Sequence, residues 1–426
     1  MKFSDYNIAP EVKKSLSKLG FKRPTDIQYK SIPYILKGED VLAIAQTGTG
    51  KTAAYGIPVI HKLHQWKMSA RRKDGIKCLI MVPTHELAIQ VTEVLNDLAK
   101  YTNIKAICLF GGVDQDPQIE LLKKGADMLV TTPGRMFDLR SQGHLDLHRV
   151  ETLILDEADH MLDKGFLKDI KDVLRYLPKR RQTLFFSATI DKNIKTLAYS
   201  LIKSSAIRIQ ISPKNPVARN VNHKVAFIGM DDKRYFLERL FREYKKAKIL
   251  VFVRTKIRAE RVCKAMERVD IHSMTMHGDK SQQQRNTAME EFKSGKIRLL
   301  IATDVSARGV DIPDVDYVVN YDLPEQTENY VHRVGRTGRG RNKGNAISFC
   351  SEQEKEILAE IEFFLGKEIQ VLDIDKRDYQ ETLDFTKDTK GLDWKALIQQ
   401  ELNRAEEEQQ LYGKKPFKKS KKKKKS

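Results

Sequence analysis

A glycine-rich turn that ends in Lys-Thr is the first feature of this sequence suited to chemistry. In AIAQTGTGKT it follows an apolar run and precedes a helix-like one. The glycines let the backbone turn tightly, so that successive N–H groups can surround an anion. Lys51 can then reach the β- and γ-phosphates of a nucleotide, and the Thr52 hydroxyl can bind Mg²⁺. Ala45 departs from the pattern GxxxxGK(S/T), and taken alone such a turn is also compatible with an ordinary loop.

A pair of adjacent carboxylates could supply the rest of a hydrolytic site. Asp156 and Glu157 come directly after the apolar run TLIL, at the end of a strand where open α/β sheets place their ligands. One carboxylate can hold Mg²⁺ while its neighbour orients and deprotonates an attacking water. An acidic turn between a strand and a helix is common and would decide nothing by itself. Together with the phosphate-binding turn upstream, it predicts nucleotide hydrolysis.

These residues need strands and helices that bring them to one edge of a sheet. Short apolar runs such as DVLAIAQ, CLIMVP and KILVFV alternate with helix-like stretches in both halves of the chain, a pattern typical of βαβ units. Between the halves, a segment with two prolines and no helical periodicity indicates a linker. We therefore expect an α/β protein with parallel-sheet domains at 1–208 and 219–375, a linker at 209–218 and a C-terminal extension at 376–426.

Composition indicates a polyanionic partner. The 426 residues carry a formal charge of 77 − 57 = +20, and such a basic excess is typical of nucleic-acid binding. Part of it comes from the lysine-rich run 414–426, which we expect to be disordered. Residues 391–412 predict an amphipathic helix that would pack on the second domain or dock a partner. Its apolar face would carry Trp394, Leu397, Ile398 and Leu402.

Several other classes of protein are disfavoured. No stretch approaches the ~18 uninterrupted apolar residues of a membrane span. The N-terminus lacks the apolar core of a secretory signal, so we expect a cytoplasmic protein with no membrane partner. The four cysteines lie far apart with no CxxC pair, which fits buried thiols and gives no support for a zinc site or a disulfide framework.

LDEADHML, with the phosphate-binding turn before it and SAT (187–189) after it, resembles the motifs of DEAD-box ATP-dependent RNA helicases. The motifs keep the family's order from residue 3 to about residue 365, and the bacterial RhlE-like group is the most similar. The resemblance implies two RecA-like domains, ATP and Mg²⁺ as cofactors, and RNA-stimulated ATP hydrolysis. It also implies that single-stranded RNA is bound largely independently of sequence and that domain closure separates short duplexes locally.

GFKRPTDIQ is similar to the family's Q motif, which implies that Gln28 recognises adenine. The amide offers one donor and one acceptor to the edge of the base, and an aromatic ring can pack beside it. Thr25 and Gln28 also fit a capping box, so that alternative stays open. Asp311 is implied to meet the ribose, or it could cap its own loop. The implied nucleotide-binding residues are Phe3, Phe21, Gln28, Ala45, Gln46, Thr47, Gly48, Thr49, Gly50, Lys51, Thr52 and Asp311, with Mg²⁺ held by Thr52 and Asp156, partly through water.

Other segments resemble the family's RNA-contacting motifs, namely PTHELA, GG and TPGR in the first half and VFVRT, HGDKSQQQR and ATDVSARGVDIP in the second. His85 stands where the family usually has arginine, and a largely neutral imidazole removes a fixed positive charge there. Arg254 replaces a commonly small or polar residue and could add a phosphate contact. The implied RNA-binding residues are Pro83, Thr84, Gly111, Gly112, Thr132, Arg135, Arg254, Thr255, Gln282, Arg285 and Thr303.

HRVGRTGRGR is similar to the family's motif HRxGRxxR. The resemblance implies that Arg336 and Arg339 reach the γ-phosphate from the second domain. His332 would couple that site to the DEAD and SAT segments, and Arg333 would couple it too or support the loop. The implied catalytic residues are Lys51, Asp156, Glu157, His332, Arg336 and Arg339. The implied coupling residues are Ser187, Thr189, Asp159 and Asp304, of which Asp304 could instead cap a loop.

Two other functions are weighed against an RNA helicase. A DNA helicase or translocase could use the same scaffold, although no motif favours DNA. A non-catalytic RNA clamp could use the basic tail and the terminal helix, but it would have no physical need for the full set of catalytic residues. We expect a monomer with ribosomal or RNA-decay partners, and the sequence does not name the RNA.

Overall fold

The computed structural model describes residues 2–46, 48–70, 75–190, 192–211, 221–307, 312, 315–338 and 343–387. The described residues up to Asp373 belong to one compact unit, and those from Ile374 to Lys387 belong to a second. Several features predicted from the sequence lie outside the described residues. They are Thr47, Asp311, Arg339, the amphipathic helix at 391–412 and the lysine-rich run at 414–426.

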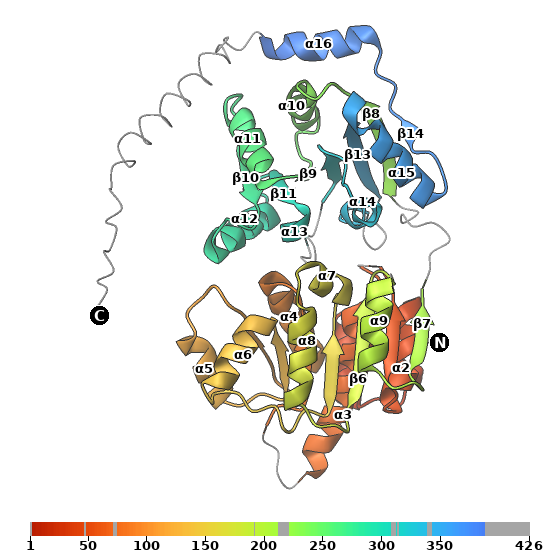
Figure 1. Ribbon diagram of the computed structural model, residues 1–426, viewed down its shortest axis with the longest axis vertical. Coiled ribbons are helices and arrows are strands. Elements are labelled where there is room, and N and C mark those ends of the chain that lie inside the picture. Colours follow the sequence, from red (N-terminus) through yellow and green to blue (C-terminus); the bar gives the residue numbers. More distant parts are fainter. Residues whose placement is uncertain are drawn as a thin grey trace, which may run out of the picture. The chain divides into compact units, whose positions relative to one another are not determined.

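The first sheet has seven parallel strands in its described part, in the order β3-β4-β2-β5-β6-β1-β7. Figure 1 labels β6 and β7 of this sheet. Parallel strands that are covered on both faces read as nearly continuous apolar runs, as the interior strands here do. The strands are β1 Val41–Ile44, β2 Cys78–Met81, β3 Ala106–Leu109, β4 Met128–Thr131, β5 Thr152–Leu155, β6 Gln182–Ser187 and β7 Ile207–Gln210.

The second sheet repeats this topology. Its described strands follow the order β10-β11-β9-β12-β13-β8-β14, which is the same order as the first sheet when each set is numbered along the chain. The strands are β8 Val221–Phe227, β9 Ile249–Val253, β10 Ser273–Met276, β11 Leu299–Thr303, β12 Tyr317–Asn320, β13 Gly344–Cys350 and β14 Gln370–Val371. The predicted α/β class with two tandem parallel-sheet domains is therefore confirmed.

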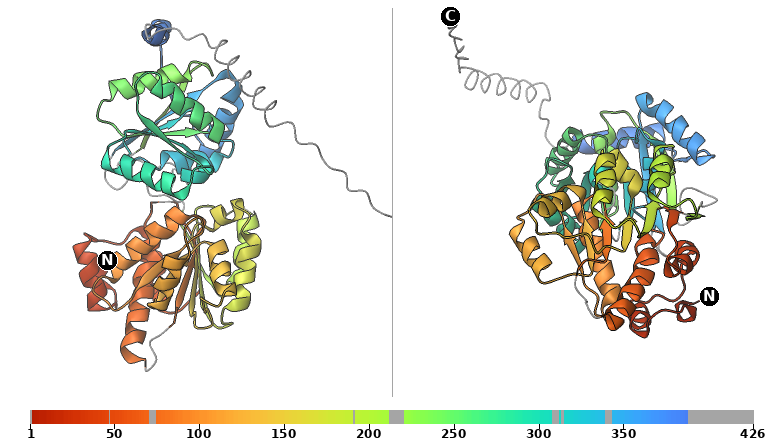
Figure 2. Two further views of the ribbon diagram at one scale, coloured as in Figure 1. Left: turned by 90° about the vertical axis from the view of Figure 1, so that its left-hand side faces the viewer. Right: turned by 60° about the horizontal axis from the view of Figure 1, so that its bottom comes forward.

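Helices cover both faces of the first sheet (Figure 2). Val41 and Ala43 of β1 pack in one apolar cluster and Leu42 and Ile44 pack in another, because successive side chains of a strand point to opposite faces. One face is covered by α1 Pro10–Lys18, α2 Asp26–Leu36, α3 Lys51–Ser69 and α4 His85–Ala99. The other is covered by α5 Asp116–Lys123, α6 Pro133–Ser141, α7 Ala158–Asp163, α8 Leu167–Val173 and α9 Lys192–Leu201.

The second domain carries a similar set of helices, of which α12, α14 and α15 contribute to its main apolar cluster. These are α10 Lys233–Glu243, α11 Lys256–Glu267, α12 Gln282–Ser294, α13 Asp304–Ala307, α14 Thr327–Val334 and α15 Lys355–Leu365. The unit that begins at Ile374 contains α16 Lys376–Lys387, a helix that was not predicted. Among the residues that the structure describes, no helix combines the length and apolarity needed to cross a bilayer.

Three strands differ from the prediction. β7 runs through Gln210, two residues into the segment expected to be a linker, and it pairs with β1 at the edge of its sheet. β8 and β14 were not predicted. All three lie at or next to a sheet edge and expose part of their side chains. Polar residues therefore interrupt the apolar runs on which the strand predictions depended.

Candidate active site

The phosphate-binding turn joins β1 to α3 at the carboxyl edge of the first sheet. Gly48 and Gly50 have φ of +81° and +90°, in the left-handed region that favours glycine, and Gly50 is the N-cap of α3. Lys51 begins that helix and is only 6% exposed. Within the described residues its Nζ has no hydrogen-bond partner. Because a buried ammonium group without a partner is costly, the turn is suited to hold an anion.

Thr25 and Gln28 tie this turn to α2. The Thr25 hydroxyl donates to the Thr49 carbonyl at 2.8 Å, and Gln28 Nε2 donates to the Gly50 carbonyl at 3.2 Å. Gln28 Oε1 accepts from the Thr25 N–H at 2.9 Å, as the capping box requires. A Cβ at position 50 would collide with the Gln28 amide. The bonds to the turn were not predicted, and adenine recognition by Gln28 stays a prediction.

The two aromatic residues assigned to the base differ in exposure. Phe3 and Phe21 pack edge to face, with ring centroids 5.8 Å apart and planes at 71°. Phe3 is buried, whereas Phe21 is partly exposed and lines a pocket together with its neighbours from Leu19 to Arg23. Phe21 is therefore the ring that a ligand can reach, and the buried Phe3 packs against it.

Asp156 is held at the end of β5 by two donors. Its Oδ2 accepts from the Tyr55 hydroxyl of α3 at 2.8 Å, and its Oδ1 accepts from the Glu157 N–H at 3.0 Å. Burial raises the pKa of Asp156 to about 6; the Lys51 charge opposes this rise and the Glu157 charge adds to it. Burial also raises the pKa of Tyr55 well above its ordinary value, so its hydroxyl stays a donor. A divalent cation would favour the charged form of the Asp156 carboxylate.

Glu157 has an unusual backbone conformation, with φ 51° and ψ 51°. A non-glycine residue in the left-handed region is uncommon and strained, and such residues cluster at functional sites. His160 Nδ1 lies 3.7 Å from Glu157 Oε2. Burial raises the pKa of Glu157, but His160 and the charges of Lys51 and Arg336 outweigh it and lower the pKa to about 2. The carboxylate is therefore ionised at neutral pH.

The DEAD and SAT segments are directly connected. The Asp159 carboxylate accepts from the backbone N–H groups of Ala188 and Thr189, each at 3.0 Å, and from the Thr189 hydroxyl at 3.2 Å. Ser187 ends β6 and is fully buried, and its hydroxyl has no partner within the described residues. Its carbonyl accepts from the Ala45 N–H at 2.9 Å, which joins SAT to the start of the phosphate-binding turn.

The arginines of HRVGRTGRGR have different surroundings. Arg333 is buried and forms two ion-pair contacts with Asp304, Nε to Oδ1 at 2.6 Å and Nη2 to Oδ2 at 2.7 Å. Its Nη1 donates to the Asp322 carbonyl at 2.7 Å. Coupling and loop support were both weighed for Arg333, and this geometry favours loop support. The Asp304 carboxylate is engaged by the same ion pair. Arg336 is also buried, donates from Nε to the His332 carbonyl at 3.3 Å, and contributes to the low pKa of Glu157.

Most RNA-binding residues predicted in the first domain follow the carboxyl ends of neighbouring strands. Pro83 and Thr84 follow β2, and the Thr84 hydroxyl caps α4 by accepting from the Leu87 N–H at 3.2 Å. Gly111 and Gly112 follow β3, and Thr132 follows β4. Arg135 instead points inward. It is 8% exposed, and its Nη2 donates to the Val113 carbonyl at 2.7 Å.

His85 and Glu86 of α4 contact two residues predicted to bind RNA from the second domain, all within the unit Met1–Asp373. A hydrogen bond of 3.0 Å joins His85 Nδ1 and Gln282 Oε1, and Arg285 Nη1 lies 3.2 Å from Glu86 Oε1. The His85 ring stacks on Phe110 with centroids 5.4 Å apart. Burial lowers the pKa of His85, so the imidazole at this position is neutral at pH 7. A contact between the two α/β domains takes the place of the fixed charge that the family usually has.

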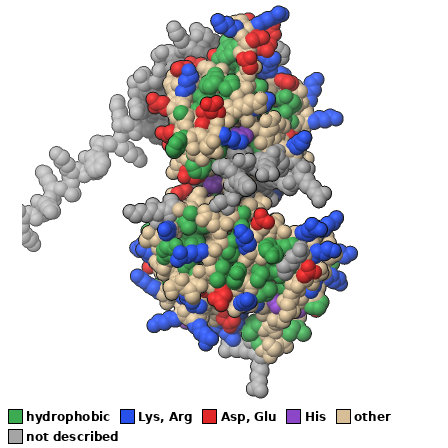
Figure 3. Space-filling view, turned by 90° about the vertical axis from the view of Figure 1, so that its right-hand side faces the viewer, with side chains coloured by type: hydrophobic (Ala, Val, Ile, Leu, Met, Phe, Trp, Pro, Cys, Tyr) green, Lys and Arg blue, Asp and Glu red, His purple; other side chains and the backbone are tan. Residues whose placement is uncertain are grey.

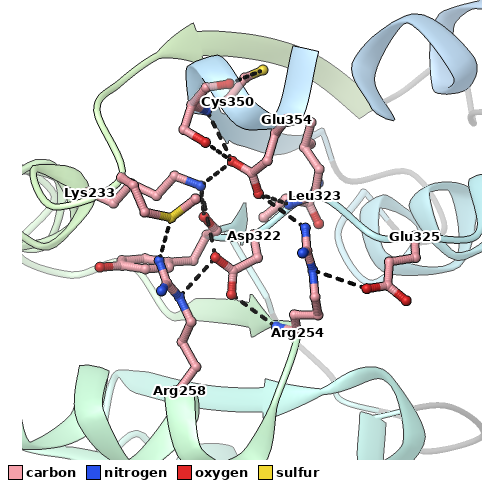
Figure 4. A network of polar contacts seen from close by, with 12 residues as sticks. Lys233, Arg254, Arg258, Asp322, Leu323, Glu325, Cys350 and Glu354 are labelled. Atoms are coloured by element: carbon pink, nitrogen blue, oxygen red, sulfur yellow. Dashed lines mark hydrogen bonds and ion pairs between the residues drawn. The ribbon is translucent and has the colours of Figure 1, made fainter. Parts of the chain in front are cut away.

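Arg254, expected to add a phosphate contact, lies in a network of charged residues at the carboxyl ends of β9, β12 and β13 (Figure 4). Its guanidinium is 3.6 Å from Glu325 and 3.6 Å from the buried Glu354. Glu354 also accepts from the fully buried Lys233 at 2.5 Å. The phosphate contact of Arg254 stays a prediction, because two carboxylates attract its guanidinium while the side chain remains 38% exposed.

The remaining predicted residues of this edge serve local structure. Thr255 is the N-cap of α11 and accepts from the Arg258 N–H at 3.2 Å. The Thr303 hydroxyl lies 3.0 Å from the Ser306 hydroxyl. On the face drawn in Figure 3, Lys and Arg side chains are scattered among acidic and apolar ones, so charge alone does not mark a binding site there.

Comparisons with known protein families agree with this geometry. The model of the DEAD/DEAH box helicase family matches residues 25–197, and that of the helicase conserved C-terminal domain matches residues 232–341. The chain is 40% identical over 371 residues to the ATP-dependent RNA helicase CshA of Listeria monocytogenes, covering 87% of this chain and 70% of that protein. It is 38% identical over 372 residues to the ATP-dependent RNA helicase RhlB of Pseudomonas syringae pv. tomato, covering 86% and 94%.

Solved structures show the same similarity. Dbp5 of S. cerevisiae, bound to RNA and ADP BeF3, superposes with a TM-score of 0.78 at 29% identity, over 91% of this chain and 99% of that one. The DEAD-box helicase Mss116, bound to ssRNA and UDP-BeF, superposes with a TM-score of 0.79 at 25% identity, over 90% and 81%.

Proposed function

Because the chain belongs to the family of DEAD-box ATP-dependent RNA helicases, we propose that it holds single-stranded RNA largely independently of sequence and separates short duplexes locally when its two α/β domains close around ATP. The observation that carries the proposal is that side chains of both domains lower the pKa of Glu157. Lys51 of the first domain, the adjacent His160 and Arg336 of the second domain all act on its carboxylate. A hydrolytic site that draws on both domains is active only when they come together.

ATP and Mg²⁺ are the proposed ligands of this site. The buried, unpartnered Lys51 Nζ suits a phosphate, and the hydroxyl and carboxylate oxygens of Thr52 and Asp156 are the donors that Mg²⁺ prefers. When bound, Mg²⁺ would neutralise charge on the phosphate oxygens. Lys51 and the backbone of the turn bind the phosphates, while Gln28 and Phe21 hold the base. The RhlE-like subgroup stays a prediction.

Glu157 is proposed to orient the attacking water. With a pKa of about 2 its carboxylate is ionised at neutral pH and accepts a hydrogen bond from the water, but it is a weak base. Its main contribution is therefore orientation rather than early proton removal. Arg336, and by resemblance Arg339, stabilise the charge that develops on the transferred phosphoryl group.

The carboxyl edges of β2, β3 and β4 in the first domain are the proposed RNA-binding surface. Their exposed turns offer backbone N–H groups and hydroxyls, which bind phosphates and sugars rather than bases, so recognition is independent of sequence. Gln282 and Arg285 would meet the RNA from the second domain beside His85 and Glu86. Ribosomal or RNA-decay partners, a monomeric state and a cytoplasmic location are part of the same proposal.

An ATPase assay with three nucleic-acid conditions tests the function. ATP turnover is measured without nucleic acid, with single-stranded RNA, and with DNA of the same sequence. We expect strong stimulation by RNA and little by DNA. Equal stimulation by DNA would favour a DNA translocase, and the absence of turnover in all three conditions would favour a non-catalytic RNA clamp.

A further inference from the structure

Tyr55 lies one helical turn after Thr52 on α3, between that helix and the end of β5. The residue is fully buried, and its ring packs edge to face on Phe186 with centroids 5.2 Å apart. This packing fixes where the hydroxyl lies. Since both faces of the first sheet are apolar, a phenylalanine would fill the same space with no polar atom to satisfy.

The Tyr55 hydroxyl contacts Asp156, one of the two residues that are proposed to hold Mg²⁺. It donates to Asp156 Oδ2 at 2.8 Å. The two oxygens of Asp156 are thereby each fixed by one donor, Tyr55 on Oδ2 and the Glu157 N–H on Oδ1. A carboxylate oxygen accepts about two hydrogen bonds, so each oxygen keeps a free direction for the ion or its water.

We infer that Tyr55 is a positioning residue of the Mg²⁺ site, whose hydroxyl sets the orientation of the Asp156 carboxylate toward the ion. The inference rests on the proposed function, because it assigns a role within the proposed nucleotide site. Partners that orient metal-binding side chains commonly change metal affinity by 10–100-fold when they are removed. Tyr55 touches the Asp156 carboxylate rather than the nucleotide, so its effect should appear only when the metal is present.

The affinity of Tyr55→Phe for a fluorescent ADP, measured in Mg²⁺ and in EDTA, tests this role. We expect roughly tenfold weaker binding than the parent in Mg²⁺ and less than twofold weaker binding in EDTA. In an Asp156→Asn background the same change should have less than a twofold effect in either condition. Tyr330→Phe is the matched control, because Tyr330 is equally buried and its hydroxyl bonds to His223 at 2.9 Å in the other sheet. It should leave both affinities unchanged.

Two results would overturn the inference. Equal loss of affinity in Mg²⁺ and in EDTA would mean that Tyr55 only packs the helix against the sheet, and unchanged affinity in Mg²⁺ would mean that the hydroxyl does not act on the ion. A parent protein whose ADP affinity does not respond to Mg²⁺ would overturn the proposed nucleotide site itself. That outcome is distinct from a responsive parent with an unaffected variant, which overturns the role of Tyr55 alone.

Discussion

Arg333 and Asp304 form a two-point ion pair inside the second domain, with N–O distances of 2.6 and 2.7 Å. The pair joins the end of α14 to the start of α13, and a coupling role was weighed for both residues from their sequence motifs. Arg333 is 1% exposed, and its remaining donors go to Asn320 and the Asp322 carbonyl. It therefore holds the arginine motif in place rather than reaching a ligand.

Replacing Arg333 should damage the fold. Arg333→Met leaves the Asp304 carboxylate, which is 23% exposed, without its partner. Breaking a fully buried pair costs about 3–5 kcal/mol of unfolding free energy, and we expect a loss below this range but above about 1 kcal/mol because water reaches the carboxylate. Urea denaturation measures the loss. Lys355→Met breaks an exposed pair with Glu352 in the same domain and should cost less than about 1 kcal/mol. Similar small losses in both variants would show that the buried pair is not structural.

Replacing Arg336 should reduce ATP turnover far more than it reduces stability. Its charge acts on Glu157 of the first domain, and an arginine that stabilises the transferred phosphoryl group contributes roughly 10³–10⁵ in rate. Arg336→Ala should therefore lower RNA-stimulated ATP turnover by a large factor within that range, while the urea midpoint changes much less than for Arg333→Met. If RNA-stimulated turnover survives intact, Arg336 does not act on the phosphate.

Glu157→Gln should bind ATP and RNA yet barely hydrolyse. The amide keeps the size of the side chain and can adopt the same left-handed backbone, but it carries no charge to orient water. Filter binding of RNA in the presence of ATP and steady-state turnover measure the two properties. Glu151→Gln, at the opposite end of β5, serves as the control and should leave turnover within about twofold. Near-normal hydrolysis by Glu157→Gln would contradict its assignment.

The interior of both sheets could be predicted from the sequence, because buried parallel strands leave continuous apolar runs. Lys51, Thr84, Asp156 and Arg254 were also placed correctly near carboxyl ends of strands, since each comes shortly after such a run. β7, β8 and β14 could not be found in this way, because polar residues interrupt strands at or near an edge.

Contacts between side chains that lie far apart in the chain also could not be predicted from the sequence. Tyr55 meets Asp156 across 101 positions, and Arg333 meets Asp304 across 29. Such contacts depend on how helices pack on the sheet, which residue spacing does not encode. Arg135 and Arg254 were expected to face RNA, but a backbone carbonyl and two carboxylates already engage them. An arginine after a strand predicts a charged contact without indicating which group it meets.

Glu260 should make the stability of the second domain depend on pH. It accepts hydrogen bonds from Thr275 and His277 at 2.6 Å and pairs with Lys280 at 2.9 Å. Burial raises the pKa of Glu260, but these three partners outweigh it and lower the pKa from 4.5 to about 2. A lowered pKa in the folded state means that the stabilisation is complete above about pH 4.5 and is lost as the pH falls toward 2.

Glu260→Gln should therefore unfold more easily than the parent at pH 7, and the difference should shrink between pH 4.5 and pH 3. Urea denaturation at a series of pH values measures both effects. Glu290→Gln is the control, because it removes an exposed carboxylate on α12. It should leave the stability unchanged at every pH of the series. A constant difference between Glu260→Gln and the parent over this range would show that the hydrogen bonds do not distinguish the charged carboxylate from the neutral amide.

Gln28 is the residue at which two functions can be separated by choice of substitution. Its Oε1 serves the cap of α2 and its Nε2 serves the Gly50 carbonyl, so one amide hydrogen and one lone pair of Oε1 stay available to a base. Gln28→Glu keeps the acceptor that a capping box uses but loses both donors. Gln28→Ala loses both the acceptor and the donors, and it should also cost about 1 kcal/mol of stability through the lost cap.

If Gln28 recognises adenine, both variants should lose preference for ATP over GTP, measured as the ratio of the two kcat/KM values. Only Gln28→Ala should in addition lose thermal stability, because Gln28→Glu retains the bond to the Thr25 N–H. If the residue acts only as a cap, Gln28→Glu should keep the parent's nucleotide preference. The two variants together therefore decide between the interpretations, whereas Gln28→Ala alone would mix a change in selectivity with a change in the fold.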